Sequence, residues 1–234
     1  MYRTVITGAS SGIGRATAIL LAKEGHSLIL NARREKQLNE LAELCLAEGA
    51  PAASAAAGDI TDQKTAQRIA ASASQLEGEL VLVNNAGFVE FGDFHESDIE
   101  RAAGMVDVML TGTMRTTHAL LPLMLADGKG TVVNVLSVAA KTEFPGAAAY
   151  CAAKAGAHMF SRVLCQGYRQ KGVRVTSIIP GSTDTPIWDP IESHPPREDM
   201  MPASAVAEAI RDAINAPRDR AVEEIVLTPP KGIL

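Results

Sequence analysis

The sequence has few cysteines, few aromatic residues and no long apolar run. Of its 234 residues, 3 are cysteines and 4% are aromatic. Cys45, Cys151 and Cys165 form no Cys-x-x-Cys pair and have no histidine at zinc-ligand spacing, which argues against a disulfide framework and against a metal site. This cysteine usage fits a reducing compartment.

Membrane spans and clustered cations are also lacking. The most apolar stretch, residues 118–126, contains Pro122 and is far shorter than the ~18 residues of a transmembrane helix. The net charge of −5 comes from 22 Lys+Arg and 27 Asp+Glu, and without a basic block it argues against nucleic-acid binding. The first predicted strand begins almost at Met1, which leaves no room for a cleaved signal and predicts a cytoplasmic protein.

What the sequence does contain is an alternation of short apolar runs and longer amphipathic stretches. This order predicts a doubly wound α/β fold, a parallel sheet with helices on both faces. No linker or charge block divides residues 1–234, so we expect a single domain. The expected strands are residues 3–7, 27–31, 50–58, 80–84, 130–137, 173–179 and 223–228, and the expected helices are residues 13–24, 35–48, 62–76, 98–124 and 149–171.

Two segments are less regular than the rest. Residues 50–58 are mostly alanine around Pro51, and only their place between two helices predicts a strand there. Residues 181–201 are rich in proline and exceed the ~12–15 residues of an ordinary loop. We interpret residues 181–201 as a substrate loop.

Glycines follow the first predicted strand directly. Gly8, Gly12 and Gly14 lie where that strand turns into the first helix. Such a turn lets the backbone approach a diphosphate, and the free N–H groups and dipole of the helix attract the anion. The alternative is simply a tight strand-to-helix turn.

The second predicted strand ends in Asn31-Ala32-Arg33-Arg34, without an acidic residue for a ribose 2′-hydroxyl. Arg33 offers a planar cation suited to a 2′-phosphate, and Arg34 could flank the adenine. These residues favour NADP(H) over NAD(H), although a solvated helix start is the plainer interpretation.

Tyr150 and Lys154 are four residues apart in a predicted helix and therefore share one face. Acid–base work near neutral pH requires the pKa of Tyr150 to fall from ~10 toward ~7, and we expect the Lys154 ammonium to lower it. Ser137 ends a predicted strand at the edge where ligands bind. Taken singly, the pair would be ordinary helix surface and the serine a turn residue.

Together, the motifs resemble the short-chain dehydrogenase/reductase family over nearly the whole chain. They are Thr7-Gly8, Gly12-x-Gly14, Asn84-Asn85-Ala86-Gly87, Ser137, Tyr150-x-x-x-Lys154 and Pro180-Gly181-x-x-x-Thr185. The resemblance implies a seven-stranded sheet of order 3-2-1-4-5-6-7 and a dehydrogenase or carbonyl reductase that uses NADP(H).

The resemblance also implies site roles. Ser137 would steady the carbonyl oxygen, Tyr150 would exchange its proton, and Lys154 would hold the nicotinamide ribose. Asp59 would meet the adenine, residues 85–87 would lie along the adenosine, and Thr185 would hold the carboxamide. The further cofactor contacts implied are Ser10, Ser11, Ile13, Ile60, Asn85, Ala86, Gly87, Pro180, Gly181 and Thr183.

Two positions depart from the family pattern. Met109 stands where the family usually has an asparagine, and a thioether cannot hold a proton-relay water. This leaves a slower enzyme, another proton path, or a catalytically impaired NADPH-binding sensor or scaffold. The chain also lacks the family's usual Gly-Gly ending. By resemblance, residues 98–124 and 149–171 would still form a homodimer, possibly a tetramer.

Aromatic side chains gather on the loops expected at the crevice. Phe91, Phe144, Ile187 and Trp188 would give it apolar walls, which favours an apolar aldehyde, ketone or 3-oxo acid. His194 and Arg197 could receive a carboxylate or could be solvated. An NAD-linked alcohol dehydrogenase is a further alternative, which Arg33 opposes.

Overall fold

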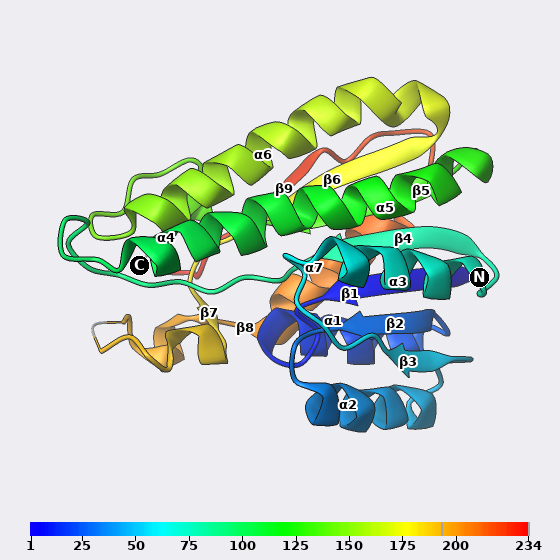
Figure 1. The fold of residues 1–234 in the computed structure, drawn as a ribbon, viewed down its shortest axis with the longest axis horizontal. Helices are drawn as coiled ribbons and strands as arrows, with labels where there is room; N and C mark the ends of the chain where they lie inside the picture. Colours follow the sequence, from blue (N-terminus) through cyan, green and yellow to red (C-terminus); the bar gives the residue numbers. More distant parts are fainter. Residues whose placement is uncertain (193, 234) are drawn as a thin grey trace.

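A parallel sheet is the centre of the computed structural model, which describes residues 1–192 and 194–233 (Figure 1). Within these residues its strands have the order β3-β2-β1-β4-β5-β6-β9, so the predicted order is confirmed with β9 as the seventh strand. The strands are β1 (Tyr2–Thr7), β2 (Ser27–Asn31), β3 (Ala53–Ala55), β4 (Glu79–Asn84), β5 (Gly130–Val135), β6 (Val173–Pro180) and β9 (Glu224–Leu227).

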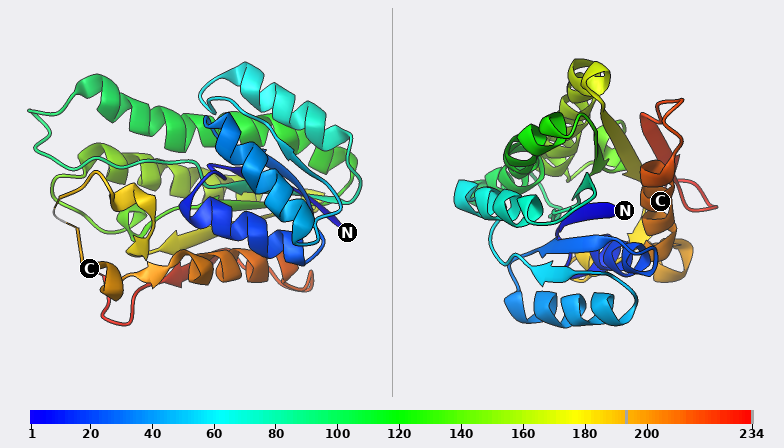
Figure 2. Two further views of the ribbon diagram at one scale, coloured as in Figure 1. Left: turned by 90° about the horizontal axis from the view of Figure 1, so that it is seen from below. Right: turned by 90° about the vertical axis from the view of Figure 1, so that its right-hand side faces the viewer.

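Helices cover both faces of the sheet (Figure 2). One face carries α1 (Gly12–Lys23), α2 (Glu35–Ala47) and α7 (Ala203–Asn215), and the other carries α3 (Gln63–Ser74), α5 (Thr113–Ala126) and α6 (Ala148–Tyr168). α4 (Ile99–Val106) packs on α6. No helix in the described part of the chain is long and apolar enough to cross a bilayer.

Successive strand residues belong to opposite layers of the core. Leu28 and Leu30 pack with α1 and α2, whereas Ile29 between them packs with α3 and α5. Side chains alternate across a strand, so a strand buried on both faces must be apolar throughout. This explains the continuous apolar runs. The free thiols of Cys45 and Cys165 are buried, one in each layer.

Three segments differ from the sequence prediction. The weak strand at residues 50–58 shrinks to the short β3. The long helix at residues 98–124 is interrupted by a π-helical segment, Asp107–Gly112, between α4 and α5. α7 is an additional helix that the prediction omitted. Apolar periodicity cannot distinguish a π-helical turn from an α-helical one, because both keep one face buried.

The predicted loop at residues 181–201 contains short regular elements. β7 (Thr183–Asp184) pairs in parallel with β8 (Met201–Pro202). Short 3-10 turns form at Pro186–Trp188 and Arg197–Asp199. The expectation that this segment holds no regular structure is therefore wrong, while Ser193 lies outside the described residues.

The strand order changes direction at β1, which lies between β2 and β4. In an open parallel sheet, the loops after the strands on either side of such a point diverge and leave a crevice. The carboxyl ends of β1, β4, β5 and β6 therefore define where a ligand can enter.

Candidate active site

A cleft of about 300 Å³ opens at the carboxyl edge of the sheet. It brings together most of the residues singled out in the sequence. They are Gly8, Ser10, Ser11, Gly12, Ile13, Arg33, Arg34, Asp59, Ile60, Asn85, Ala86, Gly87, Ser137, Tyr150, Lys154, Pro180, Gly181, Thr183, Thr185, Ile187 and Trp188.

The glycine turn after β1 needs residues without a side chain. Gly8 and Gly12 have φ of +65° and +53°, a region that favours glycine. A Cβ on Gly14 would lie 2.4 Å from the Gly8 carbonyl oxygen, so Gly14 lets α1 pack against the turn instead of lining the cleft.

The N-terminus of α1 faces this cleft, and no side chain of the helix balances the positive end of its dipole. Its N-cap, Ser11, makes no side-chain capping bond, and the first turn has no acidic residue. The N–H groups and the positive end of the helix dipole are therefore free to attract an anion.

Asn85 joins the turns after β1 and β4. Its side-chain amide donates to the carbonyls of Thr7 (3.1 Å) and Gly8 (3.2 Å), while the Thr7 hydroxyl accepts from the Asn85 and Ala86 N–H groups. This network fixes the two turns that form the floor of the cleft.

A basic end of the cleft lies beyond β2. Arg34 Nη2 donates to Ser10 Oγ (3.0 Å) and Ser11 Oγ (3.2 Å), so Arg34 lies against the glycine turn. Burial opposes ionisation of Asp59, but hydrogen bonds from Thr61 and the positive charge of Arg33 outweigh it and lower the pKa of Asp59. Two cations and two hydroxyls thus share one end of the cleft.

Ser137, Tyr150 and Lys154 meet at the opposite end. Ser137 follows β5, and its Oγ accepts from the Ala139 N–H at 3.1 Å, which leaves its O–H to serve a second partner. That O–H lies close enough to the Tyr150 oxygen to lower the pKa of Tyr150. Lys154, 7% exposed, donates from Nζ to the Val135 carbonyl at 3.0 Å, and its Nζ lies 5.7 Å from the centre of the Tyr150 ring.

The ionisation of Tyr150 differs from the sequence prediction. Burial raises its pKa to about 12, and the hydrogen bond from Ser137 opposes this rise only in part. Burial also lowers the pKa of Lys154 to about 8. The pKa of Tyr150 is therefore raised where the sequence predicted a lowering, because desolvation dominates and the Lys154 charge makes no resolved contribution.

Met109 fills the space next to Lys154. It is 2% exposed and lies in the π-helical segment, packed with Met105 and Ala153. A Cβ built on Gly87 would lie 3.2 Å from Met109 Sδ and 4.0 Å from Lys154 Nζ. A thioether is a weak acceptor and no donor, so this side chain offers little to a water at that position.

A second cavity, of about 310 Å³, adjoins the cleft at Tyr150 and Trp188. The predicted substrate residues Phe91 and Phe144 line it and do not line the cleft. Its remaining lining residues are Ala139, Ala147, Ser182 and Pro195. The sequence prediction missed these four because small residues and prolines in loops give no signal of a cavity.

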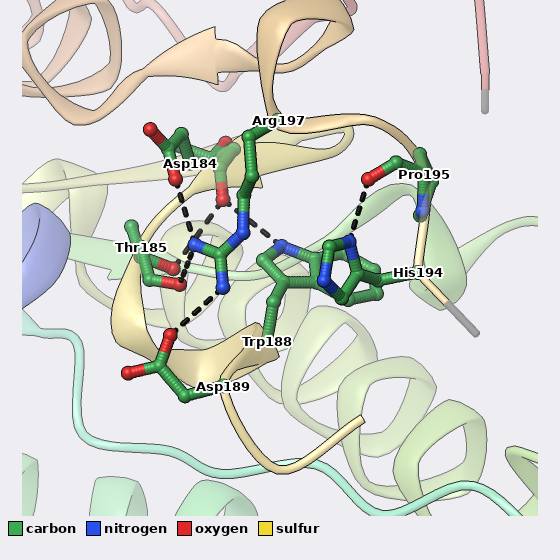
Figure 3. Close-up of polar contacts among 8 residues, drawn as sticks. Asp184, Thr185, Trp188, Asp189, His194, Pro195 and Arg197 are labelled. Atoms are coloured by element: carbon green, nitrogen blue, oxygen red, sulfur yellow. Dashed lines mark hydrogen bonds and ion pairs between the residues drawn. The ribbon is translucent and has the colours of Figure 1, made fainter. Parts of the chain in front are cut away.

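Hydrogen bonds within residues 181–201 fix the wall that Trp188 provides (Figure 3). Trp188 Nε1 donates to the Thr183 carbonyl at 3.0 Å, and its ring stacks on Phe91 with centroids 6.3 Å apart. Arg197 Nη1 donates to Asp184 Oδ1 (2.7 Å) and to the Thr185 carbonyl (3.0 Å), and Nη2 donates to Asp189 Oδ1 (2.8 Å).

Sequence comparison places the chain among known oxidoreductases. The family model described as short chain dehydrogenase matches residues 3–196. An uncharacterized oxidoreductase from Staphylococcus saprophyticus is 31% identical over 231 residues, covering 96% of each chain. Another, from Staphylococcus aureus, is 31% identical over 229 residues with the same coverage.

Solved structures have the same fold. An alcohol dehydrogenase from the archaeon Thermococcus sibiricus, complexed with 5-hydroxy-NADP, matches with a TM-score of 0.87 and 29% identity, covering 97% of this chain and 96% of its own. A metagenomic short-chain oxidoreductase in complex with NADP matches with a TM-score of 0.84 and 26% identity over 97% and 96% of the two chains.

Proposed function

The chain belongs to the short-chain dehydrogenase family, and on this basis we propose an NADP(H)-dependent oxidoreductase that interconverts a carbonyl compound and its alcohol. One observation carries the proposal. Tyr150 lines both cavities, and Ser137 lines the cleft close enough to Tyr150 to lower its pKa. A proton donor that lines both cavities serves a reaction between a cofactor in the cleft and a substrate in the second cavity.

The residues of the cleft fit a dinucleotide phosphate. The uncapped N-terminus of α1 and the open turn at Gly8 and Gly12 suit a diphosphate. At the basic end, Arg33 and Arg34 suit a 2′-phosphate, and β2 ends at Asn31, without a carboxylate for a ribose hydroxyl. NADP in two structural relatives supports this choice.

In the proposed mechanism the bound nicotinamide supplies or accepts the hydride. The Ser137 O–H would be donated to the carbonyl oxygen in place of the Tyr150 oxygen and would hold the carbonyl beside the Tyr150 hydroxyl. With a pKa of about 12, Tyr150 keeps its proton at neutral pH and gives it to the oxygen as negative charge develops there.

Lys154 keeps a positive charge beside Tyr150 below about pH 8. That charge stabilises the phenolate that forms once Tyr150 has given up its proton. Met109 motivates the alternative of a catalytically impaired NADPH-binding protein, but the convergence of Ser137, Tyr150 and Lys154 favours an enzyme. The homodimer implied by the family stays a prediction.

Tyr150→Phe tests the catalytic assignment. It removes the proton donor and keeps the ring, so carbonyl-dependent NADPH oxidation should fall by ~10²–10⁴-fold while NADP⁺ affinity is kept. Tyr168→Phe, at the other end of α6, is the matched control and should retain the rate. A wild-type rate in Tyr150→Phe would refute the assignment.

Arg33→Gln tests the cofactor preference. Loss of a charge-assisted bond to phosphate, worth about 1.5–3 kcal/mol, should weaken NADPH binding at least about tenfold and leave NADH binding unchanged. The exposed Lys36, in the first turn of α2, gives the control variant Lys36→Gln. Equal losses for both cofactors would contradict a 2′-phosphate contact.

A further inference from the structure

The second cavity is apolar except where it meets the reaction centre. Aromatic rings of Phe91, Phe144 and Trp188 line it, and its polar side chains are those of Tyr150 and Ser182. At about 310 Å³ it is at the small end of the range for ligand pockets. It has room for about ten groups of the size of a water molecule, at ~30 Å³ each.

Arg197, a cation of the substrate loop, is already paired with acidic residues of the same loop. Arg197 makes ion pairs with Asp184 and Asp189 and also donates to the Thr185 carbonyl (Figure 3). To bind a substrate carboxylate it would have to give up two carboxylates that sit on its own loop. In this conformation Arg197 lines neither cavity, which leaves the sequence-based role for it as a carboxylate receptor without support.

His194 also contacts residues of the substrate loop. Its Nδ1 lies 2.7 Å from the Pro195 carbonyl oxygen, and its ring packs at a tilt on Trp188 with centroids 6.3 Å apart. Apart from Tyr150, the described residues that line the cavity have no ionisable side chain. Because Phe91 on its rim is 41% exposed, the cavity is partly open, and an ionised group that entered it would lose part of its water and gain no counter-charge, which is unfavourable.

We propose that the substrate is an uncharged aldehyde or ketone with an apolar body about the size of one ring, and that ionised 3-oxo acids are excluded. This inference rests on the proposed function, because it assigns the substrate class of the same site. The carbonyl oxygen lies between Ser137 and Tyr150, and the apolar body lies against the aromatic wall.

A charged and an uncharged form of one compound test this inference. A cyclohexanone carboxylate and its methyl ester share the ring and the ketone but differ in charge. With NADPH, kcat/KM for the ester should exceed that for the acid by about 100-fold or more. An acid turned over as well as the ester would overturn the substrate class and leave the proposed function intact.

Binding can be measured separately from turnover, because Trp188 is the single tryptophan of the chain and lines the cavity. Its fluorescence should change on titration with the ester, with and without NADP⁺, and respond at least about tenfold more weakly to the acid. Ester binding without any turnover would uphold the substrate class and refute the proposed function. Absence of a response to the ester would overturn the substrate class.

A variant that adds a cation should reverse the preference. Phe91 lines the cavity and is 41% exposed, whereas Phe94, on the same loop and 56% exposed, does not line it. Phe91→Arg should raise the acid-to-ester ratio of kcat/KM at least about tenfold, and Phe94→Arg should leave it unchanged. Equal ratios in Phe91→Arg, Phe94→Arg and wild type would overturn the role of the aromatic wall in excluding charge.

Discussion

Lys154→Met should stabilise the cofactor-free protein, although it removes a residue proposed to serve catalysis. The Lys154 ammonium is 7% exposed and has one protein acceptor, the Val135 carbonyl. Burial lowers its pKa from 10.5 to about 8. The folded state therefore binds the proton of Lys154 more weakly than the unfolded chain does.

The size and the pH dependence of the effect follow from that pKa. The fall from 10.5 to about 8 corresponds to about 3 kcal/mol. Between about pH 8 and pH 10.5 the unfolded chain binds more protons at Lys154 than the folded protein does, so wild-type stability rises with pH. Below about pH 8 both states are protonated and the full destabilisation is present. From about pH 7 to about pH 10, the wild type should gain about 2–3 kcal/mol in stability relative to Lys154→Met.

Urea unfolding at several pH values measures this difference. Other titrating groups act in both proteins and cancel in the comparison, and the packing change from lysine to methionine adds a constant. Lys36, whose side chain is 90% exposed, provides the control variant Lys36→Met, with a small offset that does not vary with pH. If the difference between wild type and Lys154→Met were constant from about pH 7 to about pH 10, the argument that burial perturbs this lysine would be refuted.

Two other substitutions test the surroundings of the site. Met109→Asn places an amide that can hold water beside Lys154 and should raise kcat several-fold; an unchanged or lower kcat would show that a polar group there is not limiting. Arg197→Met removes the bonds to Asp184, Thr185 and Asp189 on either side of Trp188 and should raise KM for the carbonyl about tenfold with little change in kcat. Because Asp184 and Asp189 are at least half exposed, the loss of stability should be small; an unchanged KM would contradict this role.

The sheet could be predicted from the sequence because each central strand is buried on both faces. β1, β4 and β5 are buried strands whose central residues are mostly apolar, and they alternate with amphipathic helices; this pattern has few solutions other than a doubly wound sheet. β3 was poorly defined because alanines carry little strand propensity. β7 and β8 could not be predicted, since two-residue strands have no periodicity.

The sequence predicted which residues form the candidate site, but it did not predict the pKa values of their side chains. Spacing alone placed Tyr150 above Lys154 on one helix, and strand order brought Ser137 to them. Spacing cannot reveal how much water remains around a side chain, and desolvation decides the pKa of both Tyr150 and Lys154. The pairing of Arg197 with acidic residues of its own loop likewise depends on a loop conformation that prolines do not specify.

Several features at the carboxyl edge of the sheet leave bonding capacity unused, and they lie in one cleft. α1 begins without a side-chain cap, Arg33 and Arg34 flank its N-terminus, and Lys154 is buried with one protein acceptor. Each is unfavourable or unproductive in a protein that only has to fold. A single anionic ligand with hydroxyl groups would satisfy all of them together. This unused bonding capacity is therefore better explained by ligand binding than by folding, and a ligand that fills the cleft should use it.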